Sequence, residues 1–136
     1  MLLIKLLRAN QWIKNFVIFV PLFFSINWQL NDFIDLIGVF LAFSLICSSV
    51  YIFNDLIDIE NDQKHPTKKY RPIAFGLITK HRAIVIIFLL IFFSFFILYL
   101  FEKIFLIKII TFYLFLNFLY SFFLKKIKYI DIFILS

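Results

Sequence analysis

Glycine, proline and cysteine are scarce in this 136-residue sequence, which contains two, three and one of them respectively. So few glycines and prolines exclude a collagen-like chain and a flexible low-complexity linker. A single cysteine excludes a disulfide scaffold and a cysteine-based zinc cluster. Charged residues are also few, at 16% of the chain, whereas soluble domains average about 25%.

Hydrophobic residues make up 64% of the chain, and phenylalanine alone accounts for 22 residues. A soluble domain has roughly 45–50% apolar residues, and the excess found here would be left exposed to water. The net charge of +6 comes from short basic clusters between apolar runs. That pattern is typical of membrane topology and does not indicate nucleic acid binding. The composition therefore indicates an integral membrane protein.

Four stretches without a charged residue predict four transmembrane helices. Runs of about 16–19 residues rise roughly 24–28 Å as helices, close to the thickness of the hydrocarbon layer. Backbone amides in lipid must be satisfied within their own segment, which favours helices over open strands. The predicted helices cover about residues 15–31, 36–54, 83–101 and 109–124. We therefore expect an all-α integral membrane protein.

Basic residues predict the orientation of the chain. They gather in the N-terminal segment, in the connection after the second predicted helix and after the fourth, whereas the first turn carries only Asp32 and Asp35. Because loops rich in Lys and Arg stay in the cytoplasm, we expect the N-terminus and the long connection on the cytoplasmic side of the plasma (inner) membrane. The first 14 residues predict an interfacial amphipathic helix on that side.

Three aspartates open the connection over residues 54–80. Asp55, Asp58 and Asp62 are spaced i, i+3 and i+7, which places them within roughly a 60° arc of one helix face. Asn54 borders this arc, whereas Glu60 points to the opposite side. Converging carboxylates repel each other unless a cation holds them, and hard oxygen ligands suit Mg²⁺. The alternative is a solvated helix end that binds nothing.

A basic segment follows the aspartates within ten residues. It contains His65, Lys68 and Arg71 and is interrupted by Pro66 and Pro72. A cation beside such a segment suits a diphosphate, because the cation bridges phosphate oxygens while Lys and Arg neutralise the rest. The alternative is a basic cluster that serves membrane topology alone.

Other polar residues lie within the predicted helices. Small residues let helices approach each other, so residues 47–49 in the second predicted helix are expected to be packing residues. Near the end of the fourth, Asn117, Tyr120 and Ser121 either line a polar cavity or form hydrogen bonds between helices. The sequence does not decide between these two interpretations.

Several motifs together resemble the UbiA superfamily of membrane prenyltransferases. The segment NDLIDIEND, at 54–62, is similar to the first aspartate-rich motif of that family, NDxxDxxxD. Other patterns are similar to one branch, the decaprenyl-phosphate phosphoribosyltransferases: QWIKN at 11–15, HPTK at 65–68, RPIA at 71–74 and NFLYSFFLK at 117–125. The resemblance covers nearly the whole chain.

The resemblance implies a bundle of about nine transmembrane helices, of which this chain resembles the first half. The residues after Lys128, YIDIFILS, would begin a fifth helix. A second aspartate-rich motif would lie on a later cytoplasmic loop, so a C-terminal half chain is an expected partner. The 136-residue chain alone is accordingly expected to be inactive.

The implied activity is Mg²⁺-dependent transfer of 5-phosphoribosyl from phosphoribosyl pyrophosphate to a polyprenyl phosphate, for cell-envelope arabinose or polysaccharide precursors. The resemblance implies that Asp55, Asp58 and Asp62 hold the metal and that Asn54 orients a ligand. Lys68 and Arg71 would bind phosphate oxygens of the donor. The remaining candidate substrate-binding residues are His65, Tyr120, Lys14 and Lys125, of which the last two would meet the lipid phosphate.

Two other functions stay open at this point. An aromatic prenyltransferase of the same superfamily would use the metal site for a prenyl diphosphate. A truncated, non-catalytic membrane protein would carry the same acidic face without a ligand.

Overall fold

The computed structural model describes residues 2–122. Six α-helices and two 3₁₀ helices make up this part of the chain, which contains no strand. Three of the helices are long and apolar enough to cross a membrane: α3 (Leu30–Ile57), α5 (Lys80–Leu100) and α6 (Ile104–Phe122). The expectation of an all-α membrane protein is confirmed, whereas the expected count of four spans is not matched by the described residues.

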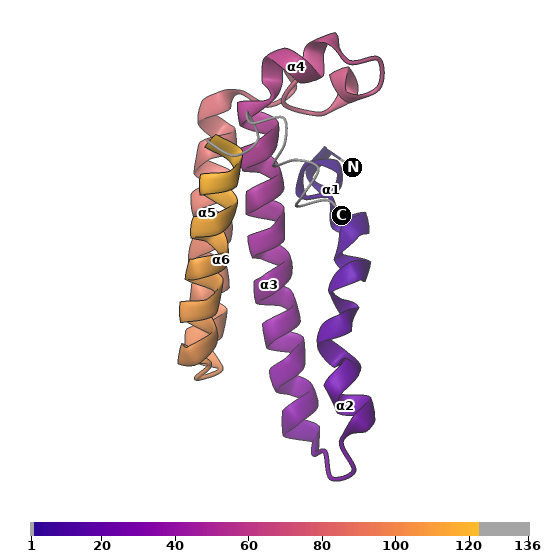
Figure 1. Ribbon diagram of the computed structural model, residues 1–136, viewed down its shortest axis with the longest axis vertical. Helices are drawn as coiled ribbons and strands as arrows, with labels where there is room; N and C mark the ends of the chain where they lie inside the picture. The colour runs from indigo at the N-terminus through magenta and orange to yellow at the C-terminus, as the bar shows by residue number, and fades with distance from the viewer. Residues whose placement is uncertain (1, 123–136) are drawn as a thin grey trace.

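Helix α3 is central in the bundle, with α5 and α6 on one side and the N-terminal segment on the other (Figure 1). Its 28 residues rise about 42 Å, which exceeds the roughly 30 Å of hydrocarbon in a bilayer. At least one end of α3 therefore extends beyond the apolar layer. The end that leads into α4 (Ile59–Lys64) carries Asp55.

The prediction of one α-helix over residues 15–31 is wrong. The chain forms a short α1 (Leu2–Leu7), then the 3₁₀ helix η1 (Ala9–Phe19) and a five-residue α2 (Val20–Phe24). Pro21 has no backbone N–H, so a regular α-helix cannot run through this junction with all its hydrogen bonds. At the rise of 3₁₀ and α-helices, η1 and α2 together still cover about 30 Å alongside α3.

The other three predicted helices have the right positions and different ends. α3 begins six residues before the predicted start at 36, because Asp32 and Gln29 cap it. The backbone N–H of Gln29 donates to Oδ2 of Asp32 at 2.8 Å. The charged residue Asp32 therefore lies in the first turn of α3, whereas a prediction from uncharged runs places it before the helix.

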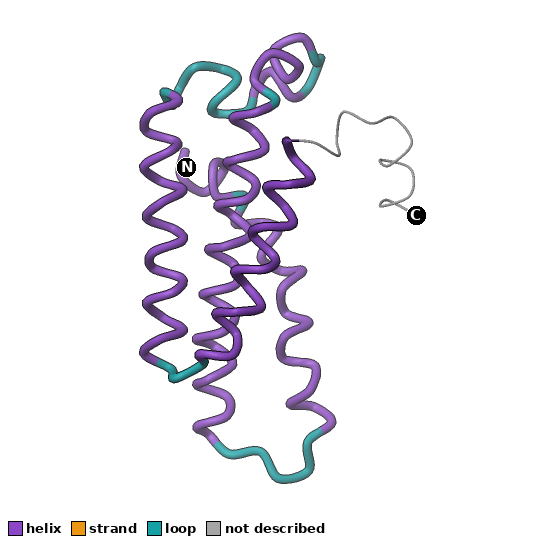
Figure 2. Tube along the Cα trace, turned by 60° about the vertical axis from the view of Figure 1, so that its left-hand side comes forward, coloured by secondary structure: helices purple, strands orange, loops and turns teal. Residues whose placement is uncertain are grey.

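The turns divide between two ends of the bundle. Figure 2 shows the turns from α2 to α3 and from α5 to α6 at one end, and the loop after α4 at the other. The N-terminal helix α1 lies toward the α4 end (Figure 1). The N-terminal segment and the aspartate-rich connection therefore face the same side, as expected, while the identity of that side stays a prediction.

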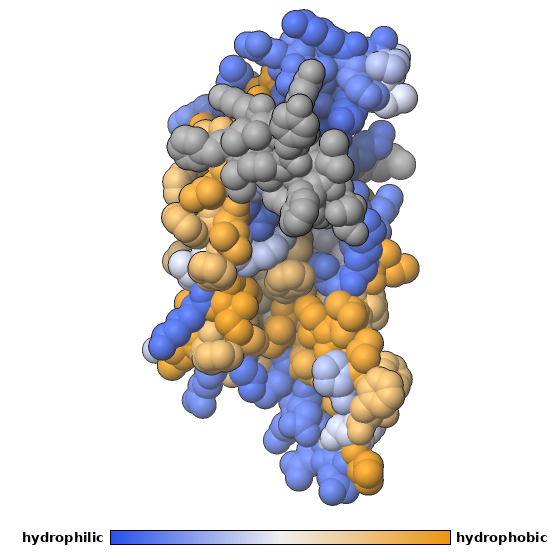
Figure 3. Space-filling model, viewed as in Figure 1, coloured by the Kyte–Doolittle hydropathy of each residue, from blue (hydrophilic) through white to orange (hydrophobic). Residues whose placement is uncertain are grey.

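Small polar residues share the contact side of α3 with buried apolar residues such as Ile46 and Ile52, whereas other large apolar residues of this helix, such as Leu41, are exposed. Ser44, Ser48 and Ser49 are fully buried, and Figure 3 shows apolar residues across the middle of the molecule, with hydrophilic residues at the α4 end. Hydrocarbon provides no drive to bury leucine or phenylalanine, so membrane helices associate through small side chains that let their backbones approach. Ser48 and Ser49 have the packing role expected for residues 47–49.

Candidate functional site

Asp55 in α3 and Asp62 in α4 are the buried acidic residues of the described chain, with 4% and 2% exposure. A buried charge is costly unless an opposite charge or several hydrogen-bond donors compensate it. Both carboxylates therefore need partners that the fold must bring to them.

A single guanidinium joins these two carboxylates. Nη1 of Arg71 lies 3.1 Å from Oδ1 of Asp55 and 2.6 Å from Oδ2 of Asp62. The structure thus brings together three residues that the sequence singles out, an aspartate from each of two helices and an arginine from the loop. A guanidinium presents several donors in a fixed plane, which suits it to bridge two anionic groups.

Buried apolar neighbours hold Arg71 in this position. Residues 72–74, directly after it, are buried, and Ile73 and Ile78 pack in one cluster with Leu6 of α1 and Ile52 of α3. The segment closes through a turn in which Gly76 has φ +84°, a conformation that glycine adopts without steric cost. The loop therefore docks on the bundle, and its docking places the preceding arginine over the aspartates.

A second guanidinium reaches Asp55 from the N-terminal segment. Nη2 of Arg8 lies 2.6 Å from Oδ1 of Asp55, and Cζ of Arg8 lies 4.8 Å from the ring centroid of Tyr51. Both contacts stabilise the cation, one by charge and one by the aromatic face. Sequence reasoning missed Arg8 because it counted this residue only toward membrane topology. The one sequence signal is that Arg8 stands three positions before the QWIKN motif.

Hydrogen bonds fasten the QWIKN motif to a polar row on α3. Trp12 Nε1 donates to Ser48 Oγ at 3.0 Å, and Asn15 Nδ2 donates to Ser44 Oγ at 3.0 Å. Ser44, Ser48 and Asp55 follow the helical repeat and share one face of α3. Two residues of the motif therefore have a docking role, and the docked segment delivers Arg8 to the end of that row.

The sequence predicts that the three aspartates lie on one continuous helix. The structure instead divides them between α3, the junction and α4. α3 ends at Ile57 and α4 begins at Ile59, with Asp58 at the junction (φ −90°, ψ 7°). The i→i−4 hydrogen bonds nevertheless continue, from Asp58 N–H to the Asn54 carbonyl at 3.0 Å and from Asp62 N–H to the Asp58 carbonyl at 2.8 Å. The helical repeat thus survives the junction and keeps Asp55 and Asp62 within reach of one arginine. Glu60 is exposed.

A small hollow opens beside this ion network. Its volume is about 170 Å³, and it is lined by Asp58, Asn61, Asp62, His65 and Lys68. Nδ1 of His65 accepts the backbone N–H groups of Thr67 at 3.3 Å and Lys68 at 3.4 Å, which orders the turn that carries Lys68. The hollow therefore combines carboxylate oxygens with a lysine.

The other predicted site residues lie apart from the hollow. Asn54 accepts a hydrogen bond from Ser121 of α6, which makes Ser121 an interhelical contact. Asn117 donates to the Tyr113 carbonyl of its own helix at 2.8 Å. Tyr120 is half-buried on α6.

The structure describes one of the two lysines predicted to meet the lipid phosphate. Lys14 is exposed on η1. Its neighbour Asn15 bonds Ser44, three helical turns from Asp55, so the structure does not bring Lys14 to the carboxylates. Lys125 lies outside the described residues.

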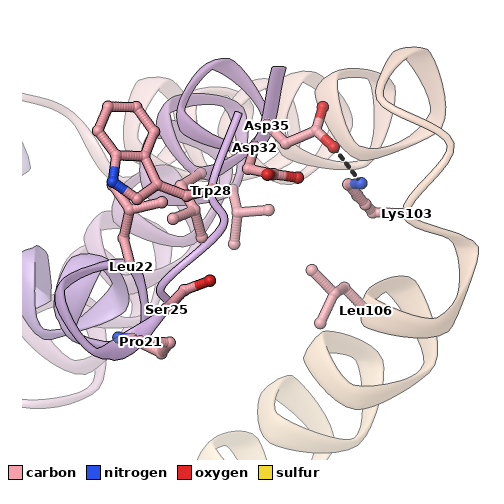
Figure 4. Close-up of a pocket in the computed structure, with 10 residues that line it drawn as sticks. Pro21, Leu22, Ser25, Trp28, Asp32, Asp35, Lys103 and Leu106 are labelled. Atoms are coloured by element: carbon pink, nitrogen blue, oxygen red, sulfur yellow. Dashed lines mark hydrogen bonds and ion pairs between the residues drawn. The ribbon is translucent and has the colours of Figure 1, made fainter. Parts of the chain in front are cut away.

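A second hollow lies at the other end of the bundle (Figure 4). It has a volume of about 460 Å³, and Trp28, Asp32, Asp35 and Lys103 are among its lining residues. Its acidic residues already have structural roles, because Asp32 caps α3 and Asp35 pairs with Lys103. Most of its other lining residues are apolar, among them Pro21, Leu22 and Leu106, so this hollow is a weaker candidate for anion or metal chemistry than the one beside Asp62.

Comparison with known families decides the membership of the chain. The model of the UbiA prenyltransferase family matches residues 16–136. The chain belongs to the UbiA prenyltransferase family.

Relatives of this chain come from several bacteria. The chain is 37% identical over 86 residues to the decaprenyl-phosphate phosphoribosyltransferase of Mycolicibacterium smegmatis, covering 60% of this chain and 27% of that protein. It is 40% identical over 79 residues to the enzyme of that name from Corynebacterium glutamicum, covering 56% and 24%. It is 49% identical over 76 residues to the uncharacterized protein y4nM of Sinorhizobium fredii, covering 54% and 14%. The similarity thus spans less than a third of each relative.

The oxygen donors of this UbiA chain fit a magnesium ion that is shared with a ligand. Among residues 2–122, no three His, Cys, Asp or Glu side chains are close enough to form a complete metal cluster. Magnesium typically takes one or two protein carboxylates and completes its shell with water and substrate phosphates. Asp58 and Asp62, which line one hollow, meet that requirement.

Proposed function

We propose that this UbiA-family chain forms the donor-binding part of an enzyme that transfers a phosphoribosyl group from phosphoribosyl pyrophosphate to a polyprenyl phosphate. The family membership and the similarity to decaprenyl-phosphate phosphoribosyltransferases support the reaction class. The other part of the enzyme would carry a second aspartate-rich motif. The 136-residue chain alone is then expected to lack transferase activity.

The observation that carries this proposal is the mixed-charge cluster around Asp62. Its carboxylate pairs with Arg71 and also lines the hollow that contains Asp58 and Lys68. Carboxylates next to basic side chains suit a ligand that combines a cation with a polyanion, because each charge then finds its opposite. A metal-bound diphosphate is such a ligand.

The roles of the side chains follow from their charge. Asp58 and Asp62, with Asp55 beside them, would hold magnesium, which when bound neutralises charge on the diphosphate oxygens. Lys68 and Arg71 would bind the remaining phosphate oxygens. An oxygen of the polyprenyl phosphate would form a bond to the anomeric carbon while the bond from that carbon to pyrophosphate breaks. The attacking phosphate is already ionised at neutral pH, so the step needs no general base.

The position of the cluster suits a lipid acceptor. Asp55 lies in the last turns of α3, a helix longer than the hydrocarbon layer is thick. The phosphate of a membrane-embedded polyprenyl phosphate lies at the interface, where the end of such a helix emerges. Lys125 stays a proposed contact for that phosphate.

The test supplies labelled donors to membranes that contain this chain together with the C-terminal part of the Mycolicibacterium smegmatis relative. We expect label from phosphoribosyl pyrophosphate to enter the lipid fraction when decaprenyl phosphate and Mg²⁺ are present. Membranes with either part alone provide the control and should give no labelled lipid.

Two results would contradict the proposal. Transfer from a prenyl diphosphate to an aromatic acceptor, with none from phosphoribosyl pyrophosphate, would assign the site to an aromatic prenyltransferase. Product formation by the 136-residue chain alone would show that a second aspartate-rich motif is not required.

A further inference from the structure

The charges of the buried cluster are balanced without any ligand. Asp55 and Asp62 carry two negative charges, and Arg8 and Arg71 carry two positive charges within 3.1 Å of them. The side chains of the two aspartates are 5% and 3% exposed, so water screens these pairs only weakly. Two of the three candidate metal ligands, Asp55 and Asp62, are thus already engaged by a guanidinium.

This balance opposes a cation or an anion that arrives alone. A divalent cation beside Asp62 would be repelled by the guanidinium of Arg71 at short range, and it would have to displace that group from the carboxylate. A diphosphate beside Arg71 would be repelled by the carboxylates for the same reason. When the cation and the diphosphate bind together, their opposite charges offset each other, so both repulsions are compensated.

We propose that Arg8 and Arg71 are built-in counter-ions that make the binding of a divalent cation and of a diphosphate mutually dependent. This inference rests on the proposed function in taking a metal-bound diphosphate as the ligand. In this arrangement Arg71 turns from the carboxylates to the diphosphate when the cation arrives. Arg8 acts through Asp55 and is a positioning residue, because it does not line the hollow.

Arg8 permits a clean test because its contacts are separate from the hollow. Its guanidinium touches Asp55 and the ring of Tyr51, while its backbone is held by the docked N-terminal segment. Arg8→Gln therefore removes one positive charge from the cluster and leaves every residue that lines the hollow in place. Arg82, exposed at the start of α5, offers the same substitution outside the cluster as a matched control.

The experiment measures Mn²⁺ binding to the full chain in lipid nanodiscs by electron paramagnetic resonance of the free ion. In the absence of pyrophosphate, Arg8→Gln should bind Mn²⁺ about tenfold more tightly than the unsubstituted chain, because one nearby repelling charge is gone. Arg8→Lys, which keeps the charge, and Arg82→Gln should match the unsubstituted chain.

A second measurement tests the coupling itself. Binding of radiolabelled pyrophosphate is followed by equilibrium dialysis at several fixed concentrations of free Mn²⁺. In the unsubstituted chain, Mn²⁺ should raise pyrophosphate affinity at least tenfold, and the same factor must apply in the reverse direction. The factor by which Mn²⁺ raises pyrophosphate affinity should be smaller in Arg8→Gln. Arg71→Gln should bind Mn²⁺ alone more tightly and pyrophosphate more weakly.

Unchanged or weaker Mn²⁺ binding in folded Arg8→Gln would overturn the inference, as would independent binding of the two ligands in the unsubstituted chain. If Arg8→Gln does not fold, two other measurements test the inference: the Mn²⁺ affinity of Arg71→Gln and the coupling factor of the unsubstituted chain. Neither readout requires group transfer. Cooperative binding without transfer would count against the proposed function alone, and transfer without cooperative binding would count against this inference alone.

Discussion

Nη2 of Arg8 lies 2.6 Å from Oδ1 of Asp55, although 47 positions separate the two residues in the chain. This ion pair joins the N-terminal segment to the aspartate-rich motif. The hydrogen bonds from Trp12 to Ser48 and from Asn15 to Ser44 lie on the same face of α3. The QWIKN and NDLIDIEND motifs are therefore parts of one structural unit.

Substitution of Ser48 should loosen the N-terminal segment. Ser48→Ala leaves the indole N–H of Trp12 without its acceptor and removes the donor to the Leu7 carbonyl. A hydrogen-bonding group left unsatisfied in this way costs about 1–3 kcal/mol. We expect a lower unfolding midpoint in detergent micelles and faster proteolysis within the first 20 residues.

Ser49→Ala is the matched control for this prediction. The hydroxyl of Ser49 is equally buried, but it donates to the Ile46 carbonyl of its own helix at 2.7 Å. Equal proteolysis of the two variants would contradict the proposed docking of the N-terminal segment on Ser48.

Gly38 is expected to tolerate no larger residue beside Phe101. A Cβ atom at position 38 would lie 2.9 Å from three ring atoms of Phe101, closer than carbon atoms approach without strain. Overpacking of this kind costs about 1–3 kcal/mol, so Gly38→Ala should lower the unfolding free energy in micelles. The double variant with Phe101→Leu should recover part of the loss, and strict additivity of the two substitutions would contradict the contact.

Cysteine labelling should reveal the orientation in the membrane. In a Cys47→Ser background, a cysteine at Lys68 should react with an impermeant maleimide only from the cytoplasmic side, and one at Asp32 only from the opposite side. Basic residues favour this orientation. The reverse pattern would place the candidate site away from a cytoplasmic sugar donor.

Much of the fold follows from the sequence because lipid imposes few solutions. Helices α3, α5 and α6 lie where charge-free runs predict them, since an uncharged stretch in hydrocarbon must satisfy its own backbone. The N-terminal stretch departs from this rule, because Pro21 and the side-chain contacts of Trp12 and Asn15 to α3 favour a different local structure.

The candidate site is only partly predictable from the sequence. The spacing of the aspartates and the composition of the basic segment locate the motif. The pairing of Arg71 with two carboxylates and the approach of Arg8 arise from tertiary docking over 16 and 47 positions. No local pattern encodes such contacts, and a basic residue near a membrane surface already has a simpler explanation in topology.

Asp55→Asn should remove transfer activity in the two-part enzyme described above. The substitution leaves Arg8 and Arg71 facing a neutral amide and weakens the charge stabilisation of the leaving group. A metal site contributes several kcal/mol to such a step, so a loss of two or more orders of magnitude is expected at about 1.4 kcal/mol per tenfold. Glu60→Gln, on the exposed side of α4, should keep most of the activity. Similar rates for the two variants would contradict the assignment of the acidic face.

The central claim is that the hollow beside Asp62 binds a diphosphate through magnesium, and equilibrium binding of radiolabelled pyrophosphate to the chain in nanodiscs tests it most directly. We expect saturable binding that requires Mg²⁺, is lost on chelation and in Asp58→Asn, and persists in Glu60→Gln. Equal binding of pyrophosphate by Asp58→Asn and Glu60→Gln, or binding that does not depend on Mg²⁺, would contradict the claim.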